Sequence, residues 1–166
     1  MKKLARLTAL LLTGALLLVV LTACGAETEQ QAKQRLLKEI NSYRASIHLD
    51  PLEEVEELSA AEQELMDHFR AAGKTALPES EADEAIESWR SKTKDWTYCS
   101  EFGPDWDYDE NFYILSTKVP ANTPEGKAEL LKELRDSGTF DDGCKHIGIA
   151  VVTIDGQMYW SCCMYN

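Results

Sequence analysis

The sequence is poor in the residues with which many enzymes work near neutral pH. It has three histidines, although histidine is the usual proton carrier at that pH and a preferred zinc ligand. No serine lies in a G-x-S-x-G context, so the nucleophile elbow of the α/β hydrolases is absent. No glycine-rich loop of the kind that holds phosphates is present either. These absences argue against a serine hydrolase and against a nucleotide-binding enzyme.

Long apolar runs are absent except at the N-terminus. Three basic residues within the first six are followed by the apolar stretch 7–21, a pattern typical of a secretory signal. The stretch is shorter than the ~20 residues of a membrane-spanning helix, which is the alternative interpretation. The tetrad Leu-Thr-Ala-Cys that ends at Cys24 resembles the bacterial lipobox, which implies cleavage before Cys24 and lipid attachment to it. We therefore predict a signal peptide at 1–23 and a lipid anchor on the extracytoplasmic face of a membrane of the bacterial cell envelope.

Basic residues are scarce as well. The chain has 17 lysines and arginines against 29 aspartates and glutamates, a formal net charge of −12. Removal of the predicted signal peptide takes away three basic and no acidic residues, which leaves 14 against 29 and a net charge of −15. A surface so acidic repels nucleic acid and anionic lipid headgroups. We therefore expect no nucleic-acid partner.

Cysteines are few, five in all, and one of them is the predicted lipid site. The other four are Cys99, Cys144, Cys162 and Cys163. Several thiols in an exported protein indicate disulfides. A bridge within the adjacent pair would be strained, so we expect Cys99 and Cys144 each to join one member of that pair, with the pairing open. A thiolate metal site is the weaker alternative, because such sites usually have C-x-x-C spacing.

About 140 residues remain after the leader, enough for one domain. The apolar periodicity first predicts three helices: one with its apolar stripe on Leu36, Ile40, Tyr43 and Ile47, one over 57–73, and one that starts at Ser80. A strand over 112–119 and a helix from Thr123 to Gly138 are predicted next. Strands over 147–154 and 157–165 end the chain. Asp155-Gly156 separates the last two strands, and this dipeptide favours a two-residue hairpin turn. The expected fold class is therefore α+β with a C-terminal β-hairpin.

Two parts of the mature chain carry motifs of a known family. Near the start, N-x-Y-R at 41–44 leads through Pro51-Leu52 into an alanine-rich helix that begins with E-L-S at 57–59. Near the end, H-I-G-I-A-V-V at 146–152 is followed by M-Y-W at 158–160. These motifs resemble the CAP superfamily, the cysteine-rich secretory, antigen 5 and pathogenesis-related proteins. The resemblance implies a three-layer α-β-α sandwich over 35–166, joined to the lipid by Cys24 and a tether within 24–34.

The resemblance also implies a cleft with two histidines and two acidic residues, which bind a divalent metal in some relatives. One acid of the family belongs to a G-E-N motif, and Glu110-Asn111 lie where that motif would fall, with Asp109 in place of glycine. An acidic loop without a special role is the alternative. The loops that carry the histidines in relatives correspond here to 73–78 and 136–144, and neither contains a histidine. The expected cleft therefore lacks its imidazoles, and His68 is expected to pack beside the apolar stripe of its helix.

Calcium is the one cofactor that the sequence leaves open. Asp105, Asp107 and Asp109 have the spacing with which an EF-hand loop begins. The glycine and the glutamate that complete such a loop are replaced by Glu110 and Ser116. An EF-hand is thus disfavoured, but a looser site of carboxylate oxygens would still suit a hard cation.

These observations predict a non-enzymatic binding or interaction module for a protein, peptide or glycan. The candidate binding residues are Glu110 and Asn111, with Trp106 at the rim. Of the four tryptophans, Trp106 is the one expected to be most exposed, because it lies among acidic residues. The alternative is a degenerate, carboxylate-dependent hydrolase or a divalent-metal-binding protein.

Overall fold

The computed structural model of the protein describes residues 27–107, 111–137 and 143–166. These residues form four helices and seven strands, so the predicted α+β class is confirmed. The helices are α2 (Glu29–Ser46), α3 (Glu56–Ala72), α4 (Glu79–Thr93) and α5 (Pro124–Ser137). The strands are β1 (Glu53–Glu54), β2 (Ala76–Pro78), β3 (Tyr98–Phe102), β4 (Asp105–Asp107), β5 (Phe112–Ile114), β6 (His146–Ile154) and β7 (Gln157–Tyr165).

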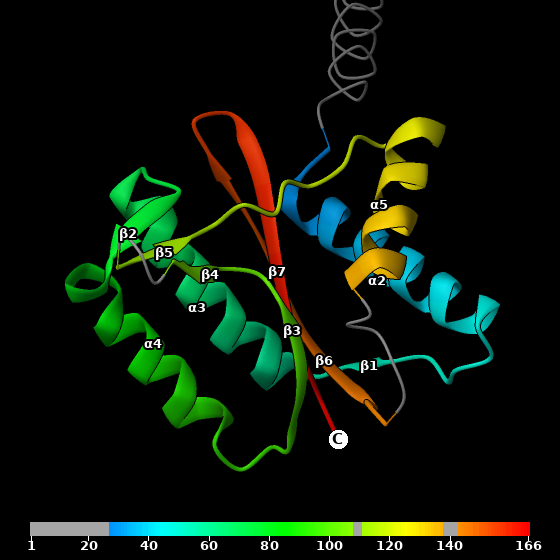
Figure 1. Ribbon diagram of the computed structural model, residues 1–166, viewed down its shortest axis with the longest axis horizontal. Helices are drawn as coiled ribbons and strands as arrows, with labels where there is room; N and C mark the ends of the chain where they lie inside the picture. Colours follow the sequence, from blue (N-terminus) through cyan, green and yellow to red (C-terminus); the bar gives the residue numbers. More distant parts are fainter. Residues whose placement is uncertain (1–26, 108–110, 138–142) are drawn as a thin grey trace, which may run out of the picture.

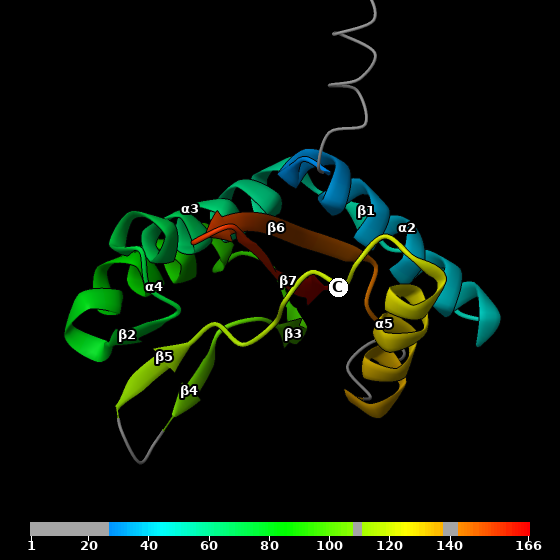
Figure 2. The ribbon, with the colours of Figure 1, turned by 90° about the horizontal axis from the view of Figure 1, so that it is seen from above.

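A four-stranded sheet with the order β1-β6-β7-β3 divides the domain (Figure 1). β1 runs parallel to β6, and the other neighbours are antiparallel. Alternate residues of β6 enter different cores, because successive side chains of a strand point to opposite faces. Ile147, Ile149 and Val151 pack with α2 and α5, whereas Ala150 and Val152 pack with α3 and α4. Two helices therefore cover each face of the sheet, as the view in Figure 2 also shows.

A second sheet of three short strands, in the order β2-β5-β4, lies beside α4. Leu77 of β2 and Leu115, which follows β5, are buried in the core shared by α3 and α4. The strand predicted over 112–119 is shorter than expected, because β5 covers only its beginning. The chain then crosses to β7, where the Val119 N–H donates to the Met158 carbonyl at 2.9 Å. This crossing covers the part of the β7 edge that β3 leaves free.

β6 and β7 form the predicted C-terminal hairpin, paired from His146 with Tyr165 to Ile154 with Gln157. Its turn is Asp155-Gly156, and the two residues have φ angles of 49° and 78°. A two-residue hairpin turn requires positive φ at these positions. The dipeptide therefore sets the register of the two central strands of the sheet.

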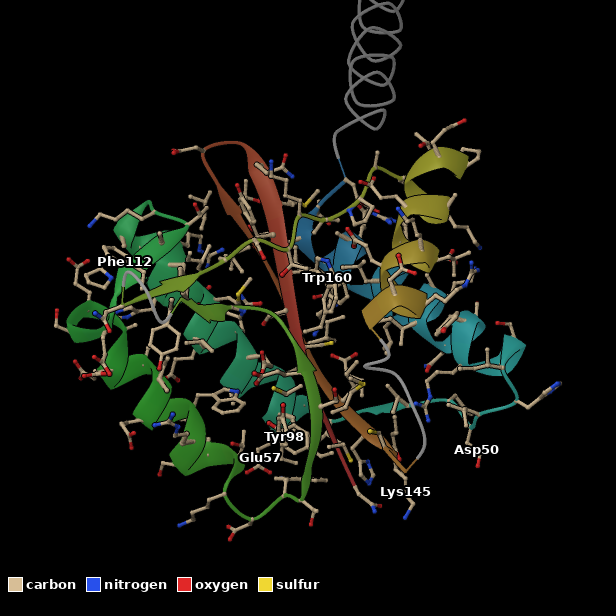
Figure 3. The ribbon with its side chains drawn as sticks, in the orientation of Figure 1. Asp50, Glu57, Tyr98, Phe112, Lys145 and Trp160 are labelled. Atoms are coloured by element: carbon tan, nitrogen blue, oxygen red, sulfur yellow. The ribbon has the colours of Figure 1, made fainter. Side chains whose placement is uncertain are left out.

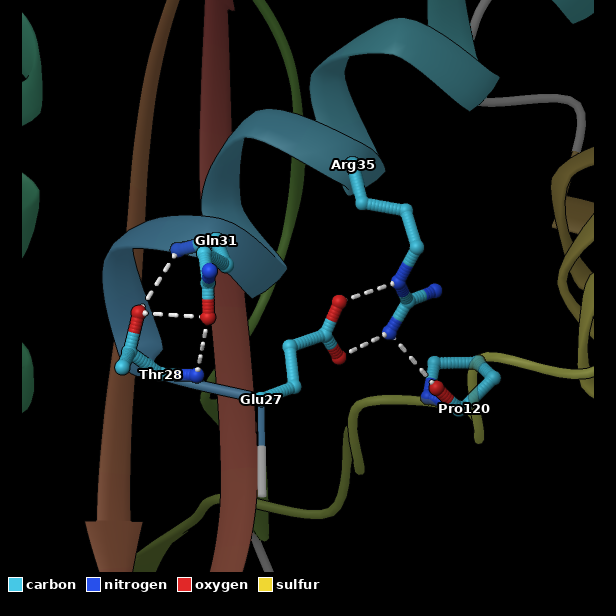
Figure 4. Close-up of polar contacts among 5 residues, drawn as sticks. All are labelled: Glu27, Thr28, Gln31, Arg35 and Pro120. Atoms are coloured by element: carbon cyan, nitrogen blue, oxygen red, sulfur yellow. Dashed lines mark hydrogen bonds and ion pairs between the residues drawn. The ribbon is translucent and has the colours of Figure 1, made fainter. Parts of the chain in front are cut away.

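Helix α2 begins at Glu29, inside the segment 24–34 that was predicted to be a tether. Thr28 caps it: its Oγ1 accepts from the Gln31 N–H at 3.2 Å, and Gln31 Oε1 accepts from the Thr28 N–H at 3.0 Å (Figure 4). Ala32 is already fully buried in the core. Helix α2 therefore begins before residue 35, the predicted start of the domain, and the capping box in T-E-Q-Q is the local signal that marks its start.

Two polar residues of α2 fix the turn that follows it. Asn41 donates from Nδ2 to the Leu52 carbonyl at 3.0 Å and accepts at Oδ1 from the Leu52 N–H at 2.8 Å. Arg44, only 2% exposed, donates to the carbonyl oxygens of Asp50 at 2.7 Å and Cys144 at 3.0 Å. The N-x-Y-R and P-L motifs are thus joined to each other and to the segment that enters β6.

Helix α3 lies very close to β6. A Cβ atom on Gly148 would come within 2.6 Å of the Leu58 carbonyl carbon, so only glycine allows this approach. The helix ends at Gly73, whose φ of 63° is that of a left-handed C-cap. The cap that the sequence predicted at Gly73 is confirmed.

The starts of α4 and α5 were predicted with different success. α4 was expected to start at Ser80, but it begins just before Ser80, with Pro78 as its N-cap and without a side-chain cap bond. The predicted start of α5 at Thr123 agrees with the structure, because Thr123 Oγ1 accepts from the Gly126 N–H at 3.2 Å and caps the helix. Gly138, the predicted end of α5, lies outside the described residues.

Candidate functional site

Glu62 is a carboxyl group inside the domain, on the face of α3 that packs against the sheet. The residue is 2% exposed. Its Oε1 accepts a hydrogen bond from Trp89 Nε1 of α4 at 2.6 Å, and its Oε2 accepts one from Ser161 Oγ of β7 at 2.7 Å. A buried carboxyl without partners would be strongly destabilising. These two bonds stabilise it and tie α3 to α4 and to the sheet.

The surroundings of Glu62 favour its protonated form. Burial raises the pKa of this carboxyl, and the negative charge of Glu101 raises it further. Hydrogen bonds from Ser161, Trp89 and Cys163 act in the opposite direction. Burial is the largest effect, so the pKa of Glu62 lies above its ordinary value of 4.5. The carboxyl therefore holds a proton at a higher pH than a glutamate in water.

A cavity of about 130 Å³ lies against Glu62. Its lining combines apolar, aromatic and acidic side chains: Leu65, Ile86, Trp89, Tyr113, Glu62 and Glu101. Apolar walls with a few polar groups are typical of ligand sites, although most such sites are larger. At the cavity, a Cβ atom on Gly103 would come within 2.6 Å of Ser161 Cβ. Glycine therefore lets the chain after β3 pass close to β7.

Cys163 is one of two cysteines, with Cys162, that line the cavity. It lies opposite Glu101 in the pairing of β7 with β3, and its Sγ lies 3.8 Å from Glu101 Oε2. Burial, followed by the charges of Glu62 and Glu101, raises the pKa of the Cys163 thiol well above its ordinary value. A thiol with such a pKa is protonated near neutral pH and is a poor nucleophile. The arrangement therefore does not favour thiol catalysis.

The described residues include the predicted binding residues only in part. Trp106 lies in β4 opposite Tyr113 of β5, and Tyr113 lines the cavity. Asn111 is exposed, has a φ of 56°, and forms the turn into β5. Glu110 lies outside the described residues. The assignment of Glu110, Asn111 and Trp106 to a binding site stays a prediction, whereas the cavity at Glu62 is a site that the sequence analysis missed.

Calcium binding also stays a prediction. Asp105 and Asp107 lie in β4, and Asp109 lies outside the described residues. Within the part of the chain that the structure describes, no group of three or more histidine, cysteine and acidic side chains is placed to hold a metal ion.

The three histidines lie apart from one another. His48 follows α2 and has a φ of 65°. His68 is half-buried, and its Nε2 lies 2.6 Å from the Glu81 carbonyl oxygen. The ring of His146 lies edge-on to Trp96 with 5.1 Å between their centres. None of the three is among the described residues that line the cavity.

No disulfide joins Cys99, Cys144, Cys162 and Cys163 in the structure. Cys162 lies in the core of α2 and α5 together with Cys144, and Cys99 packs against that core. Cys163 lies in the cluster on the other face of the sheet, because adjacent residues of a strand point to opposite faces. The expected pairing, in which both Cys162 and Cys163 bond to Cys99 and Cys144, therefore conflicts with the direction of Cys163.

Comparison of the chain with protein-family models, with curated proteins and with solved structures finds no match. Among the described residues, no helix has the length and the apolar character needed to cross a membrane.

Proposed function

We propose that the protein is a lipid-anchored binding protein of the bacterial envelope. Its folded domain takes a small ligand in the cavity beside Glu62, and Cys24 carries the lipid. The observation that carries the binding proposal is a buried carboxyl at the wall of a cavity, oriented by two hydrogen bonds. The basic start of the leader, its apolar stretch and the tetrad that ends at Cys24 support the anchor.

A CAP-like α-β-α sandwich is the fold that we propose for this domain. The two segments that carry the resemblance contact each other directly. Arg44 donates to the Cys144 carbonyl, the Val55 N–H donates to the Ile147 carbonyl at 3.1 Å, and Gly148 lies against α3. Residues of both motifs thus hold the sheet to its helices, which supports a common scaffold.

The chemistry of the cavity supports binding rather than catalysis. The Cys163 thiol is buried and has a raised pKa, so it is a poor nucleophile. Both oxygens of Glu62 accept structural hydrogen bonds, which fixes the carboxyl in place. No histidine lines the cavity among the described residues, so a proton carrier suited to neutral pH is absent from this lining.

The ligand that suits this cavity best is a small, positively charged group such as an alkylammonium ion. Glu101 supplies negative charge, and a bound cation would favour the ionised form of Glu62 as well. Each carboxylate oxygen can accept more than one hydrogen bond. Trp89 and Tyr113 add aromatic surfaces, which attract cations. Arg90 also lines the cavity, but its guanidinium pairs with Glu87 at 2.7 Å. The volume of about 130 Å³ limits the ligand to a few heavy atoms.

Butylammonium is a suitable probe, and the indole N–H of Trp89 is a suitable reporter because it donates to Glu62. In proton–nitrogen NMR spectra, with the signal assigned by Trp89→Phe, we expect butylammonium to shift this resonance and butanoate to leave it unchanged. Glu62→Gln should abolish the response. Glu57→Gln is the matched control, because Glu57 is an exposed acid of the same helix. An equal response to butanoate, or an unchanged response in Glu62→Gln, would refute the proposed ligand class.

The lipid anchor is tested separately. A bacterial host that expresses the full chain is supplied with an alkyne-tagged fatty acid, and the purified protein is examined for the tag. We expect incorporation in the wild type and its loss in Cys24→Ser. Absence of the tag from the wild type would refute the anchor and leave the cavity proposal standing.

A carboxylate-dependent hydrolase is the second candidate. Glu62 and Glu101 line one cavity, and a carboxyl with a raised pKa is suited to donate a proton. This function requires turnover of a nitrophenyl ester or glycoside that is lost in both Glu62→Gln and Glu101→Gln. Turnover that survives in either variant would assign the reaction to other groups.

A further inference from the structure

We infer that one end of the domain, which we call the anchor-side end, lies against the lipid surface. The anchor-side end consists of Glu27 to Gln30, the loop 120–123 and the turn Asp155-Gly156. The inference rests on the proposed lipid attachment at Cys24. The partner is the headgroup layer of the membrane that holds the lipid.

The first described residue is already fixed to the domain. Both carboxylate oxygens of Glu27 accept from Arg35, at 2.7 Å from Nε and 2.8 Å from Nη2 (Figure 4). The same Nη2 donates to the Pro120 carbonyl at 2.9 Å. The two side chains are mostly covered, with 17% of Glu27 and 14% of Arg35 exposed. A paired and partly buried arrangement of this kind holds its geometry better than an exposed ion pair.

The next residues are fixed as well. Thr28 forms the capping box of α2 with Gln31. Glu29 accepts from the Thr153 N–H of β6 at 2.7 Å and pairs with Arg70 of α3 at 3.0 Å. The start of α2 is therefore joined to the end of α3 and to the end of β6. The described chain is therefore fixed to the domain from Glu27 onward.

The few residues from Cys24 to Glu27 set a short distance between lipid and domain. The chain advances at most about 3.5 Å per residue, so the three steps from Cys24 to Glu27 span about 10 Å at full extension. The polar layer on one side of a bilayer is itself roughly 5–8 Å thick. Whatever path the short segment takes, Glu27 lies near the headgroups, and the anchor-side end lies there with it.

The shape and the charge of the domain fit this orientation. In Figure 1 the hairpin turn after β6 and the loop before α5 lie at the end where the chain enters α2. Asp50, Glu57 and Lys145 lie at the opposite end (Figure 3). Glu27 and Glu29 are each paired with an arginine. This pairing reduces their repulsion from anionic headgroups, although the domain as a whole is acidic.

The orientation is tested with the full, lipidated chain in vesicles of phosphatidylethanolamine and phosphatidylglycerol that contain a spin-labelled headgroup lipid. A fluorophore is placed on one introduced cysteine, at Gln30 or Asn122 of the anchor-side end, or at Asp50 or Lys145 of the far end. All four positions are exposed. The protein without an added cysteine gives the background from native thiols. We expect severalfold stronger quenching at the anchor-side positions.

Equal quenching at the two ends, or stronger quenching at the far end, would overturn the inference even if Cys24 carries lipid. An insertion of twenty glycine and serine residues after Gly25 gives a control, because such a linker spans roughly 25 Å. The insertion should leave lipid attachment unchanged and remove most of the difference between the ends. A difference that survives the insertion would contradict the argument from tether length.

Discussion

The indole N–H of Trp89 lies 2.6 Å from the carboxyl of Glu62, and this bond connects two helices that follow one another in the chain. Trp160 provides a contrast, because its indole N–H is buried and finds no hydrogen-bond partner among the described residues. One tryptophan therefore fills space and also stabilises a buried acid, whereas the other only fills space in the opposite core.

We predict that Trp89→Phe and Glu62→Gln are coupled and that Trp160→Phe and Glu62→Gln are not. Loss of the Trp89 donor leaves a buried acceptor underbonded, which costs about 1–3 kcal/mol. The measurement is a double-mutant cycle of unfolding free energies from urea denaturation. A coupling free energy of about 1 kcal/mol or more is expected for the Trp89 pair and one near zero for the Trp160 pair. Equal coupling in the two cycles would contradict this assignment.

The raised pKa of Glu62 predicts how stability depends on pH. The folded state binds the Glu62 proton more tightly than the unfolded state does. Folding is therefore favoured most at a pH where Glu62 is protonated in both the folded and the unfolded state. This contribution is present below the ordinary pKa of 4.5 and is lost as the pH rises through the higher folded pKa. The stability of the wild type relative to Glu62→Gln should therefore fall as the pH rises from 4.5.

The measurement is urea denaturation of both proteins between acid and neutral pH. Glu57→Gln is the control, because Glu57 is an exposed glutamate of the same helix. We expect no comparable decrease in the free-energy difference between the wild type and this variant. If the free-energy difference between wild type and Glu62→Gln stays constant over the range, the folded-state pKa of Glu62 is not raised.

The fold could be predicted where one short segment determines the outcome. Asp155-Gly156 specifies a hairpin by itself, because the turn depends on the φ angles of two residues. Gly73 likewise ends α3 through its own backbone conformation. The start of α2 was missed, although Thr28 and Gln31 form a local signal, because the prediction relied on the apolar stripe and overlooked the cap.

The site could not be predicted, because its parts come from distant segments. A glutamate at position 62 on the apolar face of a helix indicates a buried partner. Its partners Trp89 and Ser161 lie on α4 and β7, and nothing in the sequence says that those residues meet. Glu101 lies in β3 opposite Cys163, and no local sequence pattern marks this strand. Pairing of that kind depends on the order of strands in the sheet.

Gly148 predicts a large effect from a small change. In Gly148→Ala the new methyl group would lie 2.6 Å from the Leu58 carbonyl carbon and 2.7 Å from its oxygen. Helix α3 or strand β6 must then shift, so we expect a loss of about 1–3 kcal/mol or more in the free energy of unfolding. Because the contact is with the backbone and the Cβ of Leu58, which alanine keeps, Leu58→Ala should not restore stability. Rescue by that second change would show that side-chain atoms beyond Cβ cause the clash.

The directions of the cysteine side chains predict which thiol stays reduced under oxidising conditions. Cys99, Cys144 and Cys162 share one core, whereas Cys163 lies on the other face of the sheet beside Glu101. A disulfide requires Cβ atoms about 4 Å apart that point toward each other. Cys163 therefore has no cysteine partner on its own face among the described residues, and oxidation can join only two of the other three.

The measurement is mass spectrometry of protein purified under oxidising conditions, unfolded without reductant and alkylated. We expect Cys163 to be alkylated in every case. If a disulfide forms, one of Cys99, Cys144 and Cys162 is alkylated with it, and if none forms, all three are. Cys163→Ser should leave the number of disulfides unchanged, whereas Cys162→Ser should remove or redirect a bridge if one forms. A disulfide found at Cys163 would require β7 to rotate or β3 to shift, because the sheet separates this thiol from the other three. That result would contradict the pairing of β7 with β3, which places Cys163 and Glu101 together at the cavity.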